Sequence, residues 1–343
     1  MGKPIRKARL ALASSAVLAA YAAAPARAEA PPGFRVVDRI KGPDGKWDYA
    51  SFDPARRRLY VAHGDAVMMV EPDTGKVSPA FARGSHLHAA FALPGGDVLV
   101  TTNGDRDTAS LIDAATGAVL ADVPTGTGPD AAIFDAASGL ILVMASKAGE
   151  VTLIEPKSRK AVGSIPVGGA LEFAAVDGGG RAFVNVEDRS QIAVIDLAGR
   201  KVVARYDLKG CADPSGLAYV AGGLLISACA NGVAKVVDAK TGAIAATLSI
   251  GPRPDAVIYD AKRRLAFIPS GGDGTLAVIA VGGAAPASVL ERAPTQTGAR
   301  TGAVDPETGR VYLPTAGYKP SPTTGARPLM TPGTFEILVL APK

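Results

Sequence analysis

The chain has 343 residues, including 40 glycines and 26 prolines, and its formal net charge is +5. Five of its 37 basic residues and none of its 32 acidic residues fall within residues 1–28, so the rest of the chain carries 32 of each sign. A chain that is neutral after residue 28 does not favour general attraction to nucleic acid or to anionic lipid. Abundant glycine and proline between short aliphatic runs are typical of many short strands joined by turns.

Residues 1–28 have the pattern of a secretory leader. A cationic start that includes Lys3 and Arg6 precedes an apolar run over 10–24, and Ala26-Arg27-Ala28 is a small-x-small cleavage site. The apolar run is too short to span a bilayer comfortably. We therefore expect cleavage after residue 28, export to a bacterial periplasm without a membrane span, and a single domain over residues 29–343. The alternative is an uncleaved anchor.

Seven similar segments follow at intervals of 40 to 45 residues. They are WDYASFD (47–53), LHAAFAL (87–93), PDAAIFD (129–135), LEFAAVD (171–177), PSGLAYV (214–220), PDAVIYD (254–260) and ARTGAVD (299–305). A second, a third and in most units a fourth apolar strand follow each segment. This period fits four-stranded propeller blades and not ankyrin, tetratricopeptide or leucine-rich repeats. We predict an all-β, seven-bladed β-propeller.

The last unit ends after its third strand, while residues 34–40 form a spare strand before the first unit. We expect this N-terminal strand to become the outermost strand of blade seven. Such a closure joins the two ends of the ring and removes free sheet edges.

The quartet after each first turn, such as Tyr60-Val61-Ala62-His63 and Tyr312-Leu313-Pro314-Thr315, carries a family resemblance. The units resemble the YVTN-type, YncE-like seven-bladed propellers of exported bacterial proteins, over roughly residues 34–343. The resemblance implies the fold and says little about function, because propellers host both binding modules and enzymes. Some relatives of this type are associated with DNA binding, which the neutral chain here disfavours.

One polar position varies among the repeats in a way that points to a ligand site. The first strand of a propeller blade lines the central channel, so the second residue of each segment should lie at one mouth of that channel. We call these residues the ring: Asp48, His88, Asp130, Glu172, Ser215, Asp255 and Arg300. Loops carrying His63 and Asn185 should open on the same face. The alternative is turn chemistry, in which these side chains bond nearby backbone groups.

The only histidines are His63, His86 and His88, all at the junction of the first two units. A divalent-cation site formed by His63, His88 and one or two of Asp48, Asp130 and Glu172 is chemically reasonable, although no compact spacing motif supports it. Otherwise, the histidines hydrogen-bond loop backbone or a polar ligand. Arg300 would neutralise the acidic side of the ring or hold an anionic group.

Three functions remain open from the sequence, and it leaves undecided whether the protein is an enzyme. The first is a monomeric binding protein that takes a small polar ligand, a cation or a protein partner at Asp48, His88, Asp130, Glu172, Asp255 and Arg300. The second is a metal-dependent enzyme of the lactonase or lyase kind, in which a metal polarises a carbonyl oxygen. The third is a scaffold without a ligand.

Two further features concern the same face. Cys211 and Cys229 lie at similar distances from a hairpin turn near 221–223, so an antiparallel pair would bring them together as a disulfide. Two free thiols are the alternative. The long loop over 316–333 should lie on the ring face without regular structure, either as a lid that uses Tyr318, Lys319 or Arg327 or as plain surface.

Overall fold

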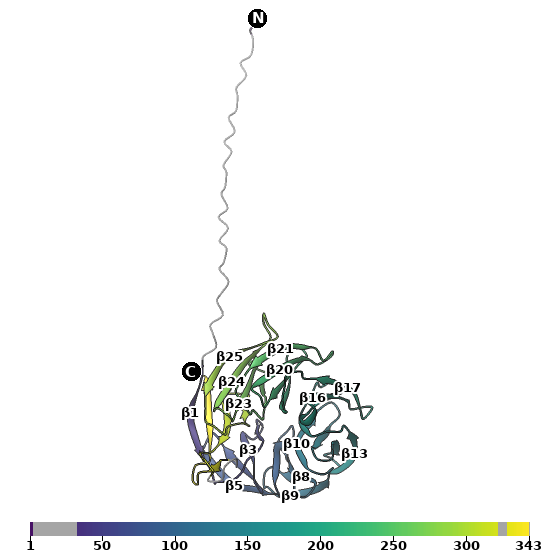
Figure 1. Ribbon diagram of the computed structural model, residues 1–343, viewed down its shortest axis with the longest axis vertical. Helices are drawn as coiled ribbons and strands as arrows, with labels where there is room; N and C mark the ends of the chain where they lie inside the picture. Colours follow the sequence, from purple (N-terminus) through teal and green to yellow (C-terminus); the bar gives the residue numbers. More distant parts are fainter. Residues whose placement is uncertain (3–32, 322–327, 343) are drawn as a thin grey trace. The chain divides into compact units, whose positions relative to one another are not determined.

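The fold consists of seven four-stranded antiparallel sheets arranged around a ring (Figure 1). The computed structural model describes residues 1–2, 33–321 and 328–342, and residues from Pro31 onward form one unit. Apart from Met1 and Gly2, the predicted leader lies outside the described residues. The predicted all-β, seven-bladed propeller with four-stranded antiparallel blades is confirmed.

The first three blades follow one another along the chain, each from its inner to its outer strand. They contain β2 (Ala50–Asp53), β3 (Arg58–His63), β4 (Ala66–Glu71) and β5 (Lys76–Arg83); β6 (Leu87–Ala92), β7 (Val98–Asn103), β8 (Thr108–Asp113) and β9 (Val119–Pro124); and β10 (Pro129–Asp135), β11 (Leu140–Ala145), β12 (Glu150–Glu155) and β13 (Lys160–Pro166).

Blades four to six repeat this order, and blade seven takes its outer strand from the N-terminus. Their strands are β14 (Leu171–Val176), β15 (Arg181–Val186), β16 (Gln191–Asp196) and β17 (Lys201–Asp207); β18 (Pro214–Val220), β19 (Leu224–Cys229), β20 (Val233–Asp238) and β21 (Ile244–Ser249); β22 (Ile258–Asp260), β23 (Leu265–Ser270), β24 (Thr275–Val281) and β25 (Ala287–Pro294); and β26 (Ala303–Val304), β27 (Val311–Thr315), β30 (Glu336–Pro342) and β1 (Phe34–Lys41).

Burial on both faces explains why the second and third strands of each blade are continuous runs of apolar residues in the sequence. In blade two, the interiors of β7 and β8 are buried, whereas β9 is exposed along most of its length. Both faces of a middle strand pack against neighbouring blades, while the outer strand faces solvent. The cores therefore lie between blades: Leu59 and Met68 of blade one pack with Tyr312 and Ile337 of blade seven.

The predicted closure of the ring by the N-terminal strand is confirmed. β1 pairs antiparallel with β30, from Phe34 opposite Pro342 to Lys41 opposite Glu336. Glu336 is buried and accepts hydrogen bonds from Arg39 and, at 2.7 Å, from Lys41 Nζ. Main-chain pairing and this charge cluster together hold the two ends of the ring in one sheet, so β30 is not left as an unpaired edge strand.

The β18–β19 hairpin brings Cys211 and Cys229 together. A disulfide joins them, with their Cα atoms 5.3 Å apart, and Pro214 lies opposite Cys229 in the strand register. This is the pairing that the hairpin spacing favoured over free thiols.

The long loop of blade seven contains regular structure that the sequence did not suggest. Its two ends form a short hairpin from β28 (Tyr318–Lys319) and β29 (Leu329–Met330). A hydrogen bond from Thr331 N to Gly317 O at 2.8 Å closes the base of this hairpin. Arg327, named above as a lid residue, lies outside the described residues.

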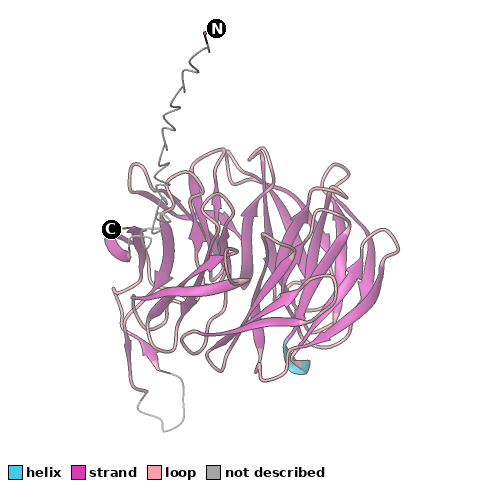
Figure 2. Ribbon diagram, turned by 90° about the horizontal axis from the view of Figure 1, so that it is seen from above, coloured by secondary structure: helices cyan, strands magenta, loops and turns pink. Residues whose placement is uncertain are grey.

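Helical structure is limited, among the described residues, to the 3₁₀ turn η1 (Glu187–Arg189) between β15 and β16. This turn lies at one face of the ring (Figure 2). No helix in the described ranges is long and apolar enough to cross a membrane.

Candidate functional site

Local irregularities in the inner strands set the direction of the ring side chains. In blades two to five, the register between the first two strands shifts across the ring residue, as between Leu87 and Ala90 around His88. Such a β-bulge re-aims a side chain and leaves a backbone group without its ladder partner. In blade two, Thr102 Oγ1 replaces that partner by accepting from Ala89 N at 2.9 Å. The remaining ring residues Asp48, Asp255 and Arg300 precede β2, β22 and β26.

Hydrogen bonds between neighbouring inner segments hold the ring residues in place around the channel. They are Tyr49 N to His88 O (3.0 Å), Thr102 Oγ1 to Asp130 O (2.6 Å), Asn185 Nδ2 to Ser215 O (2.9 Å), Ser215 Oγ to Pro254 O (3.0 Å), Asp255 N to Arg300 O (3.2 Å) and Thr301 Oγ1 to Asp48 O (2.8 Å). Backbone atoms thus fix the spacing of the blades, and most ring side chains remain directed at the channel.

Three ring residues from consecutive blades meet at the channel mouth. His88 Nδ1 lies 2.7 Å from Asp48 Oδ2 and 3.7 Å from Asp130 Oδ1, and all three side chains are half-buried. We call this group the floor site. Within the described ranges, it is the one group of three potential metal ligands whose atoms lie within 4.8 Å of one another. Two carboxylates and an imidazole are ligands that several divalent cations accept.

Burial and neighbouring charges shift the pKa values of the ionisable groups around the floor site. Burial, reinforced by the charge of Asp48, raises the pKa of Asp130 to about 7. Burial and the charges of Asp130 and Asp255 raise the pKa of Glu172 to about 10, and its carboxyl hydrogen-bonds to Glu187. Burial alone would lower the pKa of His88, but the hydrogen bond to Asp48 and the charge of Asp130 outweigh it, so that this pKa is raised. The site therefore holds protons that a bound cation would displace.

Arg300 balances the opposite side of the ring. Its Nε donates to Asp255 Oδ2 at 2.9 Å, its Nη2 donates to Trp47 O at 2.8 Å, and its guanidinium lies over the Trp47 ring. Burial and the charge of Asp48 raise the pKa of Asp255 to about 6, although Arg300 opposes the shift. Arg300 already binds partners within the protein, so we favour its role in neutralising Asp255 over a role in binding an anion.

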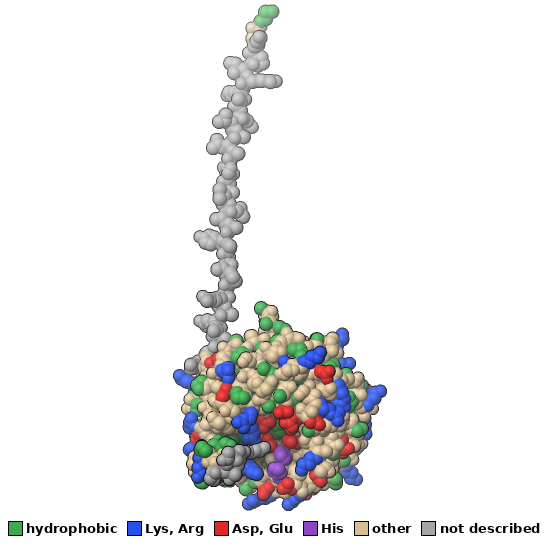
Figure 3. All heavy atoms as spheres, viewed as in Figure 1, with side chains coloured by type: hydrophobic (Ala, Val, Ile, Leu, Met, Phe, Trp, Pro, Cys, Tyr) green, Lys and Arg blue, Asp and Glu red, His purple; other side chains and the backbone are tan. Residues whose placement is uncertain are grey.

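The floor site opens into a large cavity on the ring face. The cavity has a volume of 1120 Å³, with Asp48, Asp65, His86 and Asp105 on its lining and Tyr318 and Leu329 of the β28–β29 hairpin on the same lining. Acidic side chains gather at the middle of this face, with histidine beside them (Figure 3). The middle of this face is therefore acidic, while the cavity lining also carries the basic residues Lys46, Arg253 and Arg300 and the aromatic and aliphatic side chains of the hairpin.

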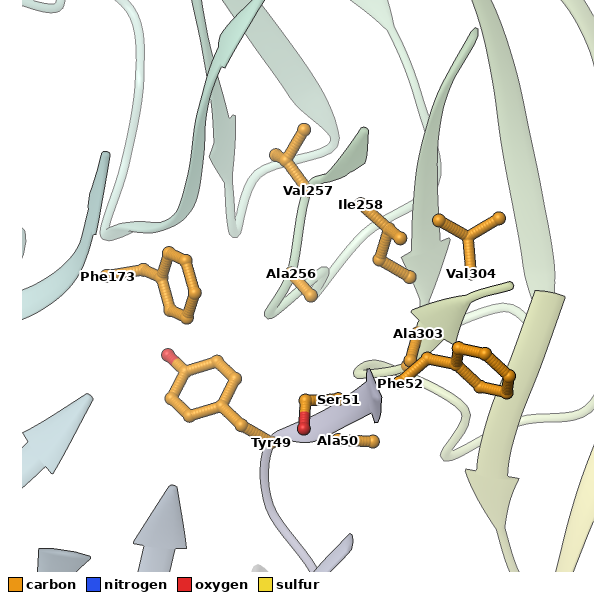
Figure 4. A pocket seen from close by; sticks show the side chains of 11 residues that line it. Tyr49, Ala50, Ser51, Phe52, Phe173, Ala256, Val257, Ile258, Ala303 and Val304 are labelled. Carbon is orange, nitrogen blue, oxygen red and sulfur yellow. The ribbon is translucent and has the colours of Figure 1, made fainter. Parts of the chain in front are cut away.

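A smaller apolar cavity lies deeper in the channel. It has a volume of 220 Å³, and Tyr49 and Phe173 lie next to each other on one side of it, with their ring centroids 5.0 Å apart (Figure 4). Tyr49 OH donates to Glu172 Oε2 at 3.5 Å. Burial, together with the charges of Asp255 and Glu172, holds the pKa of Tyr49 well above its usual range, so the phenol stays a neutral donor. The polar mouth thus gives way to an apolar chamber at this aromatic pair.

Two residues predicted for the mouth lie elsewhere. His63 is buried with its ring 4.7 Å from that of Phe335, burial lowers its pKa, and it is not part of the floor site. Asn185 is fully buried, where its amide donates to Ser215 O and Gly216 O and accepts from Ser227 Oγ. Both side chains extend from strand ends that turn into the space between blades and not into the channel.

Of the predicted metal ligands, the structure brings Asp48, His88 and Asp130 together, whereas His63 and Glu172 lie outside this group. Sequence reasoning also missed His86 and Trp47, which line the mouth cavity. A signal existed for both, because they lie within two residues of the ring positions His88 and Asp48.

Comparison with known proteins supports the fold alone. No family model and no curated protein matches the chain. Among solved structures it is similar to Kuenenia stuttgartiensis hydrazine synthase, with a TM-score of 0.69 and 16% identity over 80% of this chain and 92% of that chain. It is also similar to a chain in the crystal structure of a mitotic checkpoint complex, with a TM-score of 0.70 and 16% identity over 90% of this chain and 95% of that chain. At such low identity these similarities show a seven-bladed β-propeller and assign no family.

Proposed function

We propose that this protein is a binding protein that takes up a cation, or the cationic group of a small polar ligand, at the floor site. The observation that carries the proposal is the half-buried group of Asp48, His88 and Asp130, whose ligand atoms lie within 4.8 Å of one another at the edge of a 1120 Å³ cavity.

The electrostatics favour a cation over an anion. The carboxyl groups of Asp130 and Glu172 hold their protons more tightly than usual, because burial and neighbouring carboxylates penalise their ionised forms. A cation bound between these two carboxyl groups would favour their ionised forms and displace their protons. Arg300, the cationic member of the ring, is already paired with Asp255.

Calorimetric titration tests this proposal. Purified, chelator-treated protein is titrated at pH 7.5 with Ca²⁺, Mn²⁺ and tetramethylammonium, alongside Asp130→Asn and Glu155→Gln. Asparagine keeps the shape of Asp130 and removes its charge, so we expect cation affinity to fall at least about tenfold, in line with 1.4 kcal/mol or more of lost charge attraction. Glu155 is exposed at the end of β12, and its variant should bind like the wild type. Unchanged affinity in Asp130→Asn would refute the floor site as the binding site.

A metal-dependent lactonase- or lyase-like activity is the second candidate, and one contact favours it. Asp48 holds the Nδ1 side of His88 at 2.7 Å, which leaves Nε2 as a base, while Glu172 stays protonated as an acid nearby. Lactone hydrolysis that disappears in both His88→Gln and Glu172→Gln would support this activity. Turnover that survives in both variants would exclude these residues as the acid and base.

The protein is proposed to act in the periplasm as a monomer. The expected leader supports export. A disulfide between Cys211 and Cys229 also supports it, because disulfides form and persist in oxidising compartments. Fractionation of cells that express the full chain, followed by sizing chromatography of the exported protein, tests both points. A cytoplasmic or dimeric product would contradict them.

A further inference from the structure

We propose that His86 and His88 form a second metal site at the rim of the mouth, which takes an imidazole-preferring ion such as Zn²⁺, Ni²⁺ or Cu²⁺ through their Nε2 atoms. We call this pair the rim site. It goes beyond the proposed function, because it uses a residue outside the ring and different atoms from those that face Asp130.

Both imidazoles are oriented in the same way by carboxylates. Asp48 lies 2.7 Å from His88 Nδ1, and Asp105 lies 3.3 Å from His86 Nδ1. An ionised carboxylate only accepts hydrogen bonds, so each contact, while the floor site is empty, favours the tautomer with its proton on Nδ1 and its lone pair on Nε2. Metal-binding histidines are characteristically held in this way by a carboxylate on the nitrogen that does not bind the metal.

The two rings are close enough to share an ion. Their centroids lie 4.5 Å apart with the ring planes inclined by 48°. Zn²⁺ binds histidine nitrogen at about 2.0–2.1 Å in tetrahedral geometry, which places the centroids of two imidazoles on one ion about 5 Å apart, close to the separation here. His86 is half-exposed and lines the mouth cavity, which provides an entry path for the ion.

Space beside His88 Nε2 is kept free by a glycine. A Cβ atom added at Gly104 would lie 2.8 Å from His88 Nε2, closer than side-chain atoms tolerate. Any larger residue at position 104 would therefore cover the nitrogen that the rim site needs.

The backbone at His86 adopts a left-handed conformation that recurs at this position of the repeat. In five blades the residue two positions before the ring residue has a left-handed backbone. These residues are His86 (φ 50°), Gly128 (φ 67°), Asp213 (φ 45°), Arg253 (φ 53°) and Gly298 (φ 96°). Glycine adopts this conformation without strain, whereas histidine does not. Asp65 Oδ1 accepts from His86 N at 2.8 Å and stabilises the strained turn.

The same backbone supplies a clean test. His86→Gly removes the ligand and relieves the strain, so its thermal midpoint should equal or exceed that of the wild type. Arg253→Gly is the matched control, because it makes the same change at the same position of blade six, also on the cavity lining. Both variants and the wild type are prepared as full exported chains and treated with chelator.

Titration with Zn²⁺ and Ni²⁺ and paramagnetic resonance of the Cu²⁺ complex provide the readout. We expect His86→Gly to weaken Zn²⁺ binding about tenfold or more, and Asp105→Asn by about 10- to 100-fold, the range for a lost supporting carboxylate. The copper spectrum should show two coupled nitrogens in the wild type and in Arg253→Gly, and one in His86→Gly. Wild-type Zn²⁺ affinity in His86→Gly, or a copper spectrum without two coupled nitrogens in the wild type, would overturn the rim site.

The same experiments distinguish a failure of the floor site from a failure of the rim site. Asp130→Asn should weaken binding of the oxygen-preferring ions Ca²⁺ and Mn²⁺ and leave two nitrogens in the copper spectrum. If Ca²⁺ and Mn²⁺ bind as proposed but His86→Gly changes nothing, the floor site stands and the rim site is wrong. If the copper and zinc results hold but Asp130→Asn does not change the affinity for Ca²⁺ and Mn²⁺, the rim site stands and the floor site is wrong.

Discussion

Replacing Arg300 with methionine removes the cation that faces Asp255. The substitution keeps most of the aliphatic side chain but deletes the bonds to Asp255 Oδ2 and Trp47 O. Breaking a fully buried ion pair destabilises a protein by about 3–5 kcal/mol. The side chains of Arg300 and Asp255 are 34% and 26% exposed, so solvent screens part of this effect. We therefore expect a loss of about 2 kcal/mol at pH 8, below the buried limit.

The loss should depend on pH with a definite sign. Burial and the charge of Asp48 raise the pKa of Asp255 to about 6, and Arg300 limits that rise. Without Arg300 the pKa of Asp255 moves further up. A carboxyl whose folded-state pKa is raised loses stability as the pH rises through that pKa, because the ionised form is penalised in the folded protein. The destabilisation by Arg300→Met should therefore be largest at pH 8 and shrink toward pH 5, where Asp255 is protonated.

Urea unfolding at pH 8 and at pH 5, followed by the fluorescence of the single tryptophan, measures this effect. The double variant Arg300→Met/Asp255→Asn is the control, since it removes the unpaired carboxylate and should recover much of the loss at pH 8. If the single variant is destabilised equally at both pH values, or if the double variant is no more stable than the single, the electrostatic reasoning is refuted.

Two further predictions use the same unfolding assay. The pKa of Asp130 is raised to about 7, so its ionisation should lower the stability of the wild type as the pH rises from 5 to 8. Asp130→Asn should flatten that decline, and an unchanged slope would contradict the assigned repulsion. The Cys211–Cys229 disulfide, with a sequence separation of 18, should stabilise the fold by about 3 kcal/mol. Reductant should lower the melting temperature of the wild type and leave Cys211→Ala/Cys229→Ala unaffected; equal responses would show that the disulfide does not stabilise the fold.

The cyclic architecture could be predicted because its determinants repeat along the chain. Buried middle strands require runs of apolar residues, and turns require glycine, so each blade carries its own local pattern. The spare strand at Phe34 and the missing outer strand of the last unit then leave one way to close the ring. The convergence of His88 and Asp130 follows from the same symmetry, since equivalent positions of neighbouring blades meet at the channel.

The assignment of individual side chains to the site depended on geometry that the repeat pattern does not contain. His63 and His86 both flank the mouth in sequence, yet His63 is buried against Phe335 and His86 lies beside His88. The difference arises from local backbone direction, because His63 ends a strand between two blades while His86 occupies a left-handed turn.

The composition and spacing of the chain by themselves determine the number of blades, the closure and the polar ring, since these depend on local patterns and their period. Only the tertiary structure decided that Asn185 is a buried link between blades, that Arg300 is paired with Asp255, and that the pKa of Asp130 is raised to about 7. These properties depend on distances between residues far apart in the sequence and on the water excluded around them.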